Sequence, residues 1–197
     1  CMVGVLILIS LVPLIDERRI SRNTRAKQHT GAGIRIKWLL PLLPVLGISV
    51  VATGILSLEQ SALPIDLVRG GLERPALTES GSGALIALQL TLLVFLQWPV
   101  GRWLADRSVR FGLGLSLASF SVACLLLAVS ALTSIGMVVV IVALIPMALA
   151  QAAFLPTATE AVIEETPPEH RGLAMALFSQ CFAISAVFAP LLGGILL

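Results

Sequence analysis

A short charged stretch between two apolar runs holds the side chains best suited to making and breaking polar contacts. Asp106 and three arginines lie within residues 101–110, whereas residues 83–98 and 113–135 carry no charge. An aspartate at a tight loop can accept hydrogen bonds from backbone N–H groups at a helix N-terminus, and an arginine can pair with a carboxylate through two hydrogen bonds. This chemistry predicts a reversible latch between helices; the alternative is that the arginines only supply cytoplasmic charge. The residues assigned to the latch are Gly101, Asp106, Arg107 and Arg110.

The cysteines and histidines are too few and too scattered to predict a metal site, a haem site or a disulfide framework. The three cysteines lie far apart, and the two histidines fall in predicted loops. The chain also lacks the paired acids, the Ser/His pair or the zinc motif that an intramembrane protease needs. The net charge of +2 gives no reason to expect a nucleic-acid partner. We therefore expect no cofactor, no metal ion and no enzymatic activity.

Amide and hydroxyl groups are the polar side chains that the sequence places inside its apolar runs. Gln89 and Gln151 are the best candidates for a solute path, with hydrogen bonding between helices as the plainer alternative. No Asp, Glu, Lys, Arg or His is expected near the middle of a complete span. Since an ionisable residue at that depth is functional by default, the sequence predicts no proton relay in these spans.

Transmembrane helices are the elements expected to position these residues. The chain has 197 residues, of which 57% are hydrophobic and 12% are charged, and its mean hydropathy is +1.01. A soluble domain carries about 25% charged residues. The apolar runs have the length of membrane helices, about twenty residues, and lack the short alternating segments of an outer-membrane barrel. The predicted fold class is therefore an all-α integral membrane protein.

Five complete spans follow the partial one with which the chain opens. Residues 1–15 are interpreted as the end of a preceding transmembrane helix, because a signal peptide would need a basic segment before them and a cleavage site after them. Residues 16–37 are interpreted as a basic cytoplasmic linker. The chain is therefore expected to be a piece of a longer protein. The complete spans are expected at about 38–58, 83–104, 111–132, 135–156 and 173–197.

The basic residues test whether these spans alternate in direction. If the loop at 16–37 is cytoplasmic, the loops on its side hold eleven of the thirteen basic residues, and the opposite loops hold two. Cytoplasmic loops of membrane proteins carry such an excess of Lys and Arg. The count therefore predicts that the charged stretch and Arg171 both face the cytoplasm.

The last span carries small residues at a helical spacing. Ser185, Ala189 and Gly193 are spaced by four residues, which places them on one face where two backbones can approach closely. Pro190 would add a kink that lets the helix rock. The residues expected to pack this helix are Ser185, Ala189, Pro190, Gly193 and Gly194.

The charged stretch resembles the loop that follows the second helix of each half in the major facilitator superfamily. That pattern is close to Gly-x-Leu-Ala-Asp-Arg-x-Gly-Arg-Arg, and Leu104-Ala-Asp-Arg107 with Arg110 matches it. Gly101 lies one residue further from Asp106 than in the pattern, and Val109 and Phe111 replace its second Gly and its last Arg.

Two more motifs resemble the same family. Pro167-Pro-Glu-His-Arg-Gly-Leu-Ala174, with Arg171 and Gly172, is similar to the Pro-x-x-x-Arg-Gly-x-Ala loop before the fifth helix of a half. Ala189-Pro-Leu-Leu-Gly-Gly194 is similar to the Gly-Pro-x-x-Gly-Gly of the antiporter branch. The three motifs occur in the family's order and cover almost the whole chain.

The resemblance implies a secondary active transporter in the plasma or inner membrane, built from two six-helix halves that rock around a central site. It implies a small solute and the bilayer as partners, as in drug or metabolite efflux, together with the N-terminal half of the same protein. The chain would run from the end of helix 6 to helix 11; if residues 1–15 did not belong, the same spans would be helices 1 to 5. Asp106 would be the latch, Arg110 its partner in the same half, and Glu160 the acceptor for Arg110.

One other class of function stays open at this point. A membrane sensor or scaffold could keep the family's fold without moving a solute, because fold resemblance does not fix function. Only a measured flux separates the two interpretations. A membrane-embedded enzyme is the weakest reading, since no catalytic constellation is present.

Overall fold

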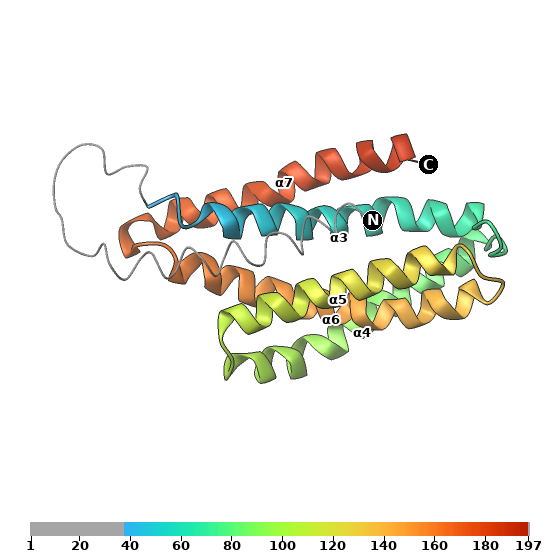
Figure 1. Ribbon diagram of the computed structural model, residues 1–197, viewed down its shortest axis with the longest axis horizontal. Helices are drawn as coiled ribbons and strands as arrows, with labels where there is room; N and C mark the ends of the chain where they lie inside the picture. Colours follow the sequence, from blue (N-terminus) through green and yellow to red (C-terminus); the bar gives the residue numbers. More distant parts are fainter. Residues whose placement is uncertain (1–37, 197) are drawn as a thin grey trace.

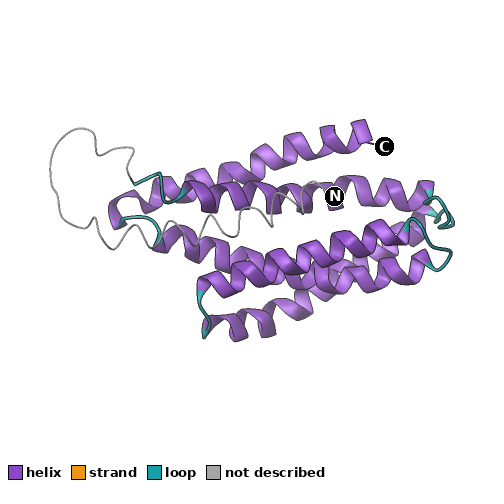
Figure 2. Ribbon diagram, viewed as in Figure 1, coloured by secondary structure: helices purple, strands orange, loops and turns teal. Residues whose placement is uncertain are grey.

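The computed structural model describes residues 38–196, and within that range it contains only helices and their connections (Figure 1). Figure 2 shows the same arrangement coloured by secondary structure, and it confirms the all-α prediction for these residues. The predictions for 1–15 and 16–37 lie outside the described residues. The elements are α3 (Leu43–Arg69), α4 (Glu79–Ala105), α5 (Val109–Ser130), α6 (Gly136–Glu164), the 3-10 turn η1 (Pro168–His170) and α7 (Arg171–Leu196).

The five long helices are each long and apolar enough to cross a membrane. Consecutive helices run in opposite directions, so their connections alternate between the two ends of the bundle (Figure 1). The α4–α5 turn and the α6–α7 connection share one end, which carries the charged stretch and Arg171; we name it the inner end after the topology that the sequence predicts. The α3–α4 loop and the α5–α6 turn form the outer end.

The helices pack in two layers, with α3 beside α7 in one layer and α4, α5 and α6 in the other. α6 is the central element, because it contacts each of the other four long helices. Alanines recur on its buried surface, where their small side chains let neighbouring helices approach closely. Those alanines are Ala143, Ala148, Ala150, Ala152, Ala153, Ala158 and Ala161.

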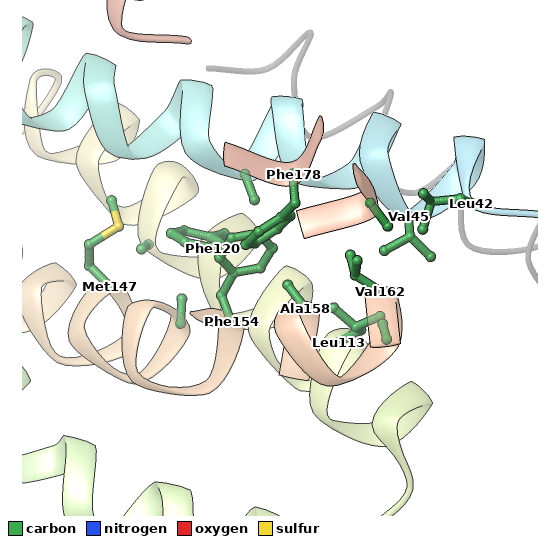
Figure 3. Packing of buried hydrophobic residues seen from close by; sticks show 14 residues of the cluster. Leu42, Val45, Leu113, Phe120, Met147, Phe154, Ala158, Val162 and Phe178 are labelled. Carbon is green, nitrogen blue, oxygen red and sulfur yellow. The ribbon is translucent and has the colours of Figure 1, made fainter. Parts of the chain in front are cut away.

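The apolar core lies where the two layers meet. Phe120 of α5, Phe154 of α6 and Phe178 of α7 gather there, as Figure 3 shows. The rings of Phe120 and Phe154 meet edge to face, with centroids 6.3 Å apart, a favourable geometry for two aromatic groups. This cluster holds the layers together towards the inner half of the bundle.

α3 extends further at its outer end than the predicted span 38–58. Glu59 was expected to lie in a loop, but apolar residues continue after it as far as Val68. Pro64 lies inside the helix without ending it, because a membrane helix tolerates proline when neighbouring groups satisfy the freed backbone. The prediction that no ionisable residue lies near the middle of a span is therefore wrong, since Glu59 lies ten residues before the end of α3.

α6 also continues past its predicted end in the span 135–156, so Glu160 lies in the helix and not in a loop. Pro156 is accommodated inside it. The hydroxyls of Thr157 and Thr159 donate to carbonyls four residues earlier, at 2.6 and 2.8 Å. Such local bonds satisfy hydroxyl groups inside a membrane helix.

Side-chain caps set the start of two helices slightly before their predicted starts. Thr78 precedes α4 and accepts a hydrogen bond from the N–H of Gly81 at 3.2 Å. Ser108 precedes α5 and accepts from the N–H of Phe111 at 3.3 Å. Threonine and serine are preferred at this position because their oxygen satisfies a free backbone donor.

The predicted small-residue face of α7 lies against α3. The Ser185 hydroxyl lies 2.7 Å from the Thr53 hydroxyl and donates to the Val50 carbonyl at 3.0 Å. Ala189 and Gly193 are buried on the same face, and a Cβ added to Gly193 would contact α3. Pro190 and Gly194 lie on exposed positions instead.

A buried arginine fastens the outer end of the bundle. Arg74 lies in the α3–α4 loop, and its side chain is 1% exposed. Its guanidinium pairs with the Asp66 carboxylate at 2.5 Å and donates to the Ser130 hydroxyl at 3.0 Å. The backbone N–H of Glu73 also donates to the Ala131 carbonyl at 3.2 Å. The end of α3, the loop and the end of α5 are thus held together by what we call the Arg74 clamp.

Candidate functional site

A polar pair lies in the middle of the helices, between the two layers. The Gln151 amide of α6 donates to the Glu59 carboxylate of α3, with 2.6 Å between Nε2 and Oε2. The two residues are 92 positions apart in the sequence. The bond therefore forms only when α3 and α6 are packed together, and it orients one carboxylate oxygen of Glu59.

A third polar residue, Gln89 of α4, lies at a similar depth. Glu59 lies ten residues before the outer end of α3, and Gln89 lies ten residues after the outer start of α4. At a rise of 1.5 Å per residue, both lie about 15 Å from the outer ends of their helices. Since the hydrocarbon core of a bilayer is about 30 Å thick, both positions are deep in a membrane.

Glu59, Gln89 and Gln151 line one cavity of about 50 Å³. A cavity of this size has room for a few water molecules or one small polar group. Its walls come from three helices and are otherwise largely apolar. The remaining lining residues are Gln60, Leu63, Leu67, Leu85, Ile86, Leu90 and Leu144.

The amide of Gln89 is the unusual group in this cavity. The residue is 7% exposed, and neither its Nε2 nor its Oε1 has a hydrogen-bond partner among the described residues. A buried polar group without a partner costs about 1–3 kcal/mol. Gln89 therefore adds a donor and an acceptor to the cavity that no other described side chain uses.

The lining of the cavity can bind a hydrogen-bonding or charged group. Its single ionisable group is the Glu59 carboxyl, and its other polar groups are amides. Across residues 38–196, no three His, Cys, Asp or Glu side chains are grouped so that they could hold a metal ion. The arrangement offers one carboxyl and several amide groups to a polar ligand.

Sequence reasoning identified Gln89 and Gln151 as path candidates, and the structure places both beside the same cavity. It missed Glu59. A signal was present, because Ala62, Leu63, Ile65 and Leu67 continue the apolar run after the acid. Against this signal, Ser61 looks like a loop residue in the sequence; in the structure its hydroxyl donates to the Ser57 carbonyl at 2.7 Å inside α3.

The charged stretch forms a tight turn at the inner end. Asp106 caps the C-terminus of α4, and α5 begins three residues later. Its side chain is exposed and meets no hydrogen-bonding or charged partner within residues 38–196. Arg107 lies over the rings of Trp103 and Phe111, at 5.4 and 5.8 Å from their centroids. The turn therefore holds Arg107 against aromatic rings and leaves Asp106 accessible.

Two glycines at the ends of this stretch, Gly101 and Gly112, differ in how closely other residues pack against them. A Cβ added to Gly101 would meet nothing within 4 Å, whereas one added to Gly112 would overlap side-chain atoms of Thr157 and Leu104. Close packing of α5 on α6 thus depends on Gly112. Gly101 lines an open groove between α4 and α6 at the inner end, and the groove is also lined by Gln97, Glu160 and Glu164.

The other predicted gating residues lie at the same inner end. Arg171 and Gly172 form the exposed first turn of α7. Glu160 lies on the exposed side of α6, and Arg110 lies in the first turn of α5. The pairing of Arg110 with Glu160 stays a prediction.

Comparison with known families gives one match that spans most of the chain. The family profile of the Major Facilitator Superfamily matches residues 30–197. Comparison with curated proteins and with solved structures gives no match.

Proposed function

Because the chain belongs to the major facilitator superfamily, whose members are multi-pass membrane transporters, we propose that it is the C-terminal half of a secondary transporter. In this proposal the whole protein moves a small solute across the plasma or inner membrane by alternating access. The partner half is the N-terminal half of the same protein. The Glu59 cavity lies on the path of the solute.

The observation that carries the proposal is the Glu59–Gln151 hydrogen bond beside a cavity at membrane depth. An ionisable side chain in the hydrocarbon region is costly, and it persists where a path for ions or solutes needs it. α3 and α6 belong to different layers, so a solute that binds between them can influence how the layers pack. A sensor or scaffold has no comparable need for a carboxyl at this depth.

Rocking of a half as a unit requires that its helices move together. The α3–α7 contact through Ser185 and the Arg74 clamp at the outer end support such rigidity. At the inner end, Asp106 is the proposed latch against the other half, with Arg110 and then Glu160 as the residues that orient it. Arg171 and Gly172 complete the inner face in this proposal.

Replacement of Glu59 with Gln tests the proposed path. Gln has almost the same shape and can still meet Gln151, so we expect the protein to fold and insert normally while solute uptake falls at least tenfold. The measurement is uptake by proteoliposomes that contain the protein expressed from its full gene, with a panel of small solutes.

The matched control is Glu73→Gln, which removes a carboxylate from an exposed position in the outer loop. Its uptake should stay within twofold of the unsubstituted protein. Full uptake by Glu59→Gln would rule out the proposed role of Glu59. Absence of flux for every solute, with intact folding, would favour the sensor or scaffold.

A further inference from the structure

The Glu59 cavity has a charge character that limits what it can bind. No lysine, arginine or histidine is among its lining residues. The nearest basic residue along α3 is Arg69, which is ten residues from Glu59 and about 15 Å further along the helix axis. The cavity is therefore neutral or negative, and no basic side chain in its lining compensates the carboxylate.

The polar groups of the cavity include two acceptors that a cation can meet, one on Glu59 and one on Gln89. Gln151 uses its Nε2 on the Glu59 carboxylate, which fixes one oxygen and leaves the other oxygen of that carboxylate to a ligand. Gln89 contributes a buried Oε1 and a buried Nε2, neither of which has a partner among the described residues, and its Oε1 can accept a hydrogen bond from a ligand. A group with several N–H donors can meet these acceptors together, as an ammonium group with three donors does.

The cavity's size and walls restrict the ligand further. About 50 Å³ accommodates a charged head group and not a whole drug-sized molecule. The leucine and isoleucine side chains of the lining suit a short hydrocarbon chain. Ile86 and Leu90 are exposed at the edge of the cavity, so the remainder of a larger ligand can extend past them.

We propose that this cavity binds the ammonium group of a small organic cation, with Glu59 as its counter-ion and Gln89 Oε1 as a second acceptor. This inference rests on the proposed transport function and names the charge class of its solute. An anion would meet the Glu59 carboxylate without a compensating charge in a medium of low dielectric constant, where like charges repel strongly. A neutral alcohol would gain hydrogen bonds but no attraction between charges.

Three compounds of equal carbon number test the charge class. Propylammonium, propanol and propionate are titrated into the purified protein, expressed from its full gene, at one pH and ionic strength, and the heat of binding is measured. We expect propylammonium to bind and the other two to give no measurable binding. Equal binding of propanol or propionate would overturn the proposal.

Variants connect the binding to the cavity. Glu59→Gln should weaken propylammonium binding at least tenfold, and Gln89→Leu about threefold or more, whereas Glu73→Gln should leave it within twofold. Size-exclusion profiles confirm that each variant is folded. Unchanged propylammonium binding by Glu59→Gln would overturn the proposal in favour of another site. Binding of Na⁺ at millimolar concentration without any binding of propylammonium would overturn it in favour of an inorganic cation.

Uptake measurements separate this proposal from the transport function itself. Glu59-dependent uptake without preference for cations would overturn the charge class and leave the transporter in place. Propylammonium binding that depends on Glu59, in a protein that moves no solute, would support the cation site and count against transport.

Discussion

At the scale of single residues, Gly101 and Gly112 show that two glycines of one motif-like stretch can have different roles. Gly112 is buried where α5 meets α6, and a side chain there would overlap Thr157 and Leu104. Gly101 borders an open groove and has nothing within 4 Å of the place where its Cβ would lie. Within the described residues, Gly112 therefore constrains the packing of the helices and Gly101 does not.

Gly112→Ala should therefore destabilise the protein, whereas Gly101→Ala should not. Inserting a methyl group into a packed contact costs about 1–3 kcal/mol, because neighbours must shift. Thermal denaturation of the purified variants measures the difference. Equal melting temperatures for the two variants would show that α5 and α6 can relax around Gly112.

Asp106→Asn tests the proposed latch at the inner end. The change removes the charge and keeps the shape, and the side chain is exposed, so folding and insertion should be preserved. Uptake should fall at least fivefold, because a neutral amide interacts less favourably with helix N-termini and arginines. Glu169→Gln is the control, since Glu169 is an exposed acid at the same end. Full uptake by Asp106→Asn would exclude the latch.

Some of the site could be predicted from single residues and some could not. An amide inside an apolar run is conspicuous, so Gln89 and Gln151 were identifiable. Glu59 was harder to place, because Gln60 and Ser61 follow it and a polar triplet normally marks a loop; the apolar residues after the triplet were the one signal that the helix continues. The Ser61 hydroxyl bonds within the helix, and that local satisfaction is visible only in three dimensions.

At the scale of elements, the Arg74 clamp joins segments that the sequence treats as separate. The loop between α3 and α4 is short, and nothing in its composition shows that one arginine would be buried. Arg74 has contacts with the Asp66 carboxylate, the Asp66 carbonyl and the Ser130 hydroxyl. These contacts hold the outer ends of α3 and α5 together.

Arg74→Ala should lower stability and leave the topology unchanged. The loss of charge-assisted hydrogen bonds costs about 2 kcal/mol, and Asp66 retains some solvent access. Arg74→Lys should recover part of this loss, since it restores the charge but not the fork of donors. Thermal denaturation gives the melting temperatures of Arg74→Ala and Arg74→Lys, with Glu73→Gln as the control from the same loop. A melting temperature for Arg74→Ala equal to that of the control would mean that the clamp contributes nothing measurable.

The helices themselves were largely predictable, and their ends less so. Five apolar runs were sufficient to predict the number and direction of the long helices of 38–196. The predicted ends of α3 and α6 were wrong, because Glu59 and Pro156 were taken as helix boundaries. In the packed bundle both residues lie inside a helix, where Glu59 has Gln151 as its hydrogen-bond partner. Membrane helices are apolar on all sides, so the sequence rarely shows which face packs; the small residues of α7 were an exception.

At the scale of the whole molecule, the bond between Glu59 and Gln151 connects the two layers. The two layers could not be predicted from the sequence. Short connections favour packing between helices that are neighbours in sequence, whereas α3 packs beside α7, which is far from it in the chain. The apolar cluster around Phe120 also joins the layers, but it lacks the directionality of a hydrogen bond. In the proposed function, the same pair of residues therefore both joins the layers and binds the solute.

A double substitution separates those two contributions. Gln151→Leu leaves the Glu59 carboxyl without its donor and should destabilise the protein by about 1–3 kcal/mol. Glu59→Leu combined with Gln151→Leu removes both partners, which can be nearly neutral for stability, so the melting temperature should recover. Uptake should stay lost in the double variant. Recovery of uptake would show that the polar pair serves folding alone.

The Arg74 clamp has a consequence for the order in which the protein is made. The ribosome adds Ser130 56 residues after Arg74, whereas Asp66 is added eight residues before it. The acid partner is thus already present when Arg74 emerges, and the hydroxyl partner is not. Until the end of α5 has been synthesised, Arg74 can pair with Asp66 but not with Ser130. The complete set of Arg74 contacts therefore depends on α5, so a chain that stops before Ser130 would lack the clamp's link to that helix.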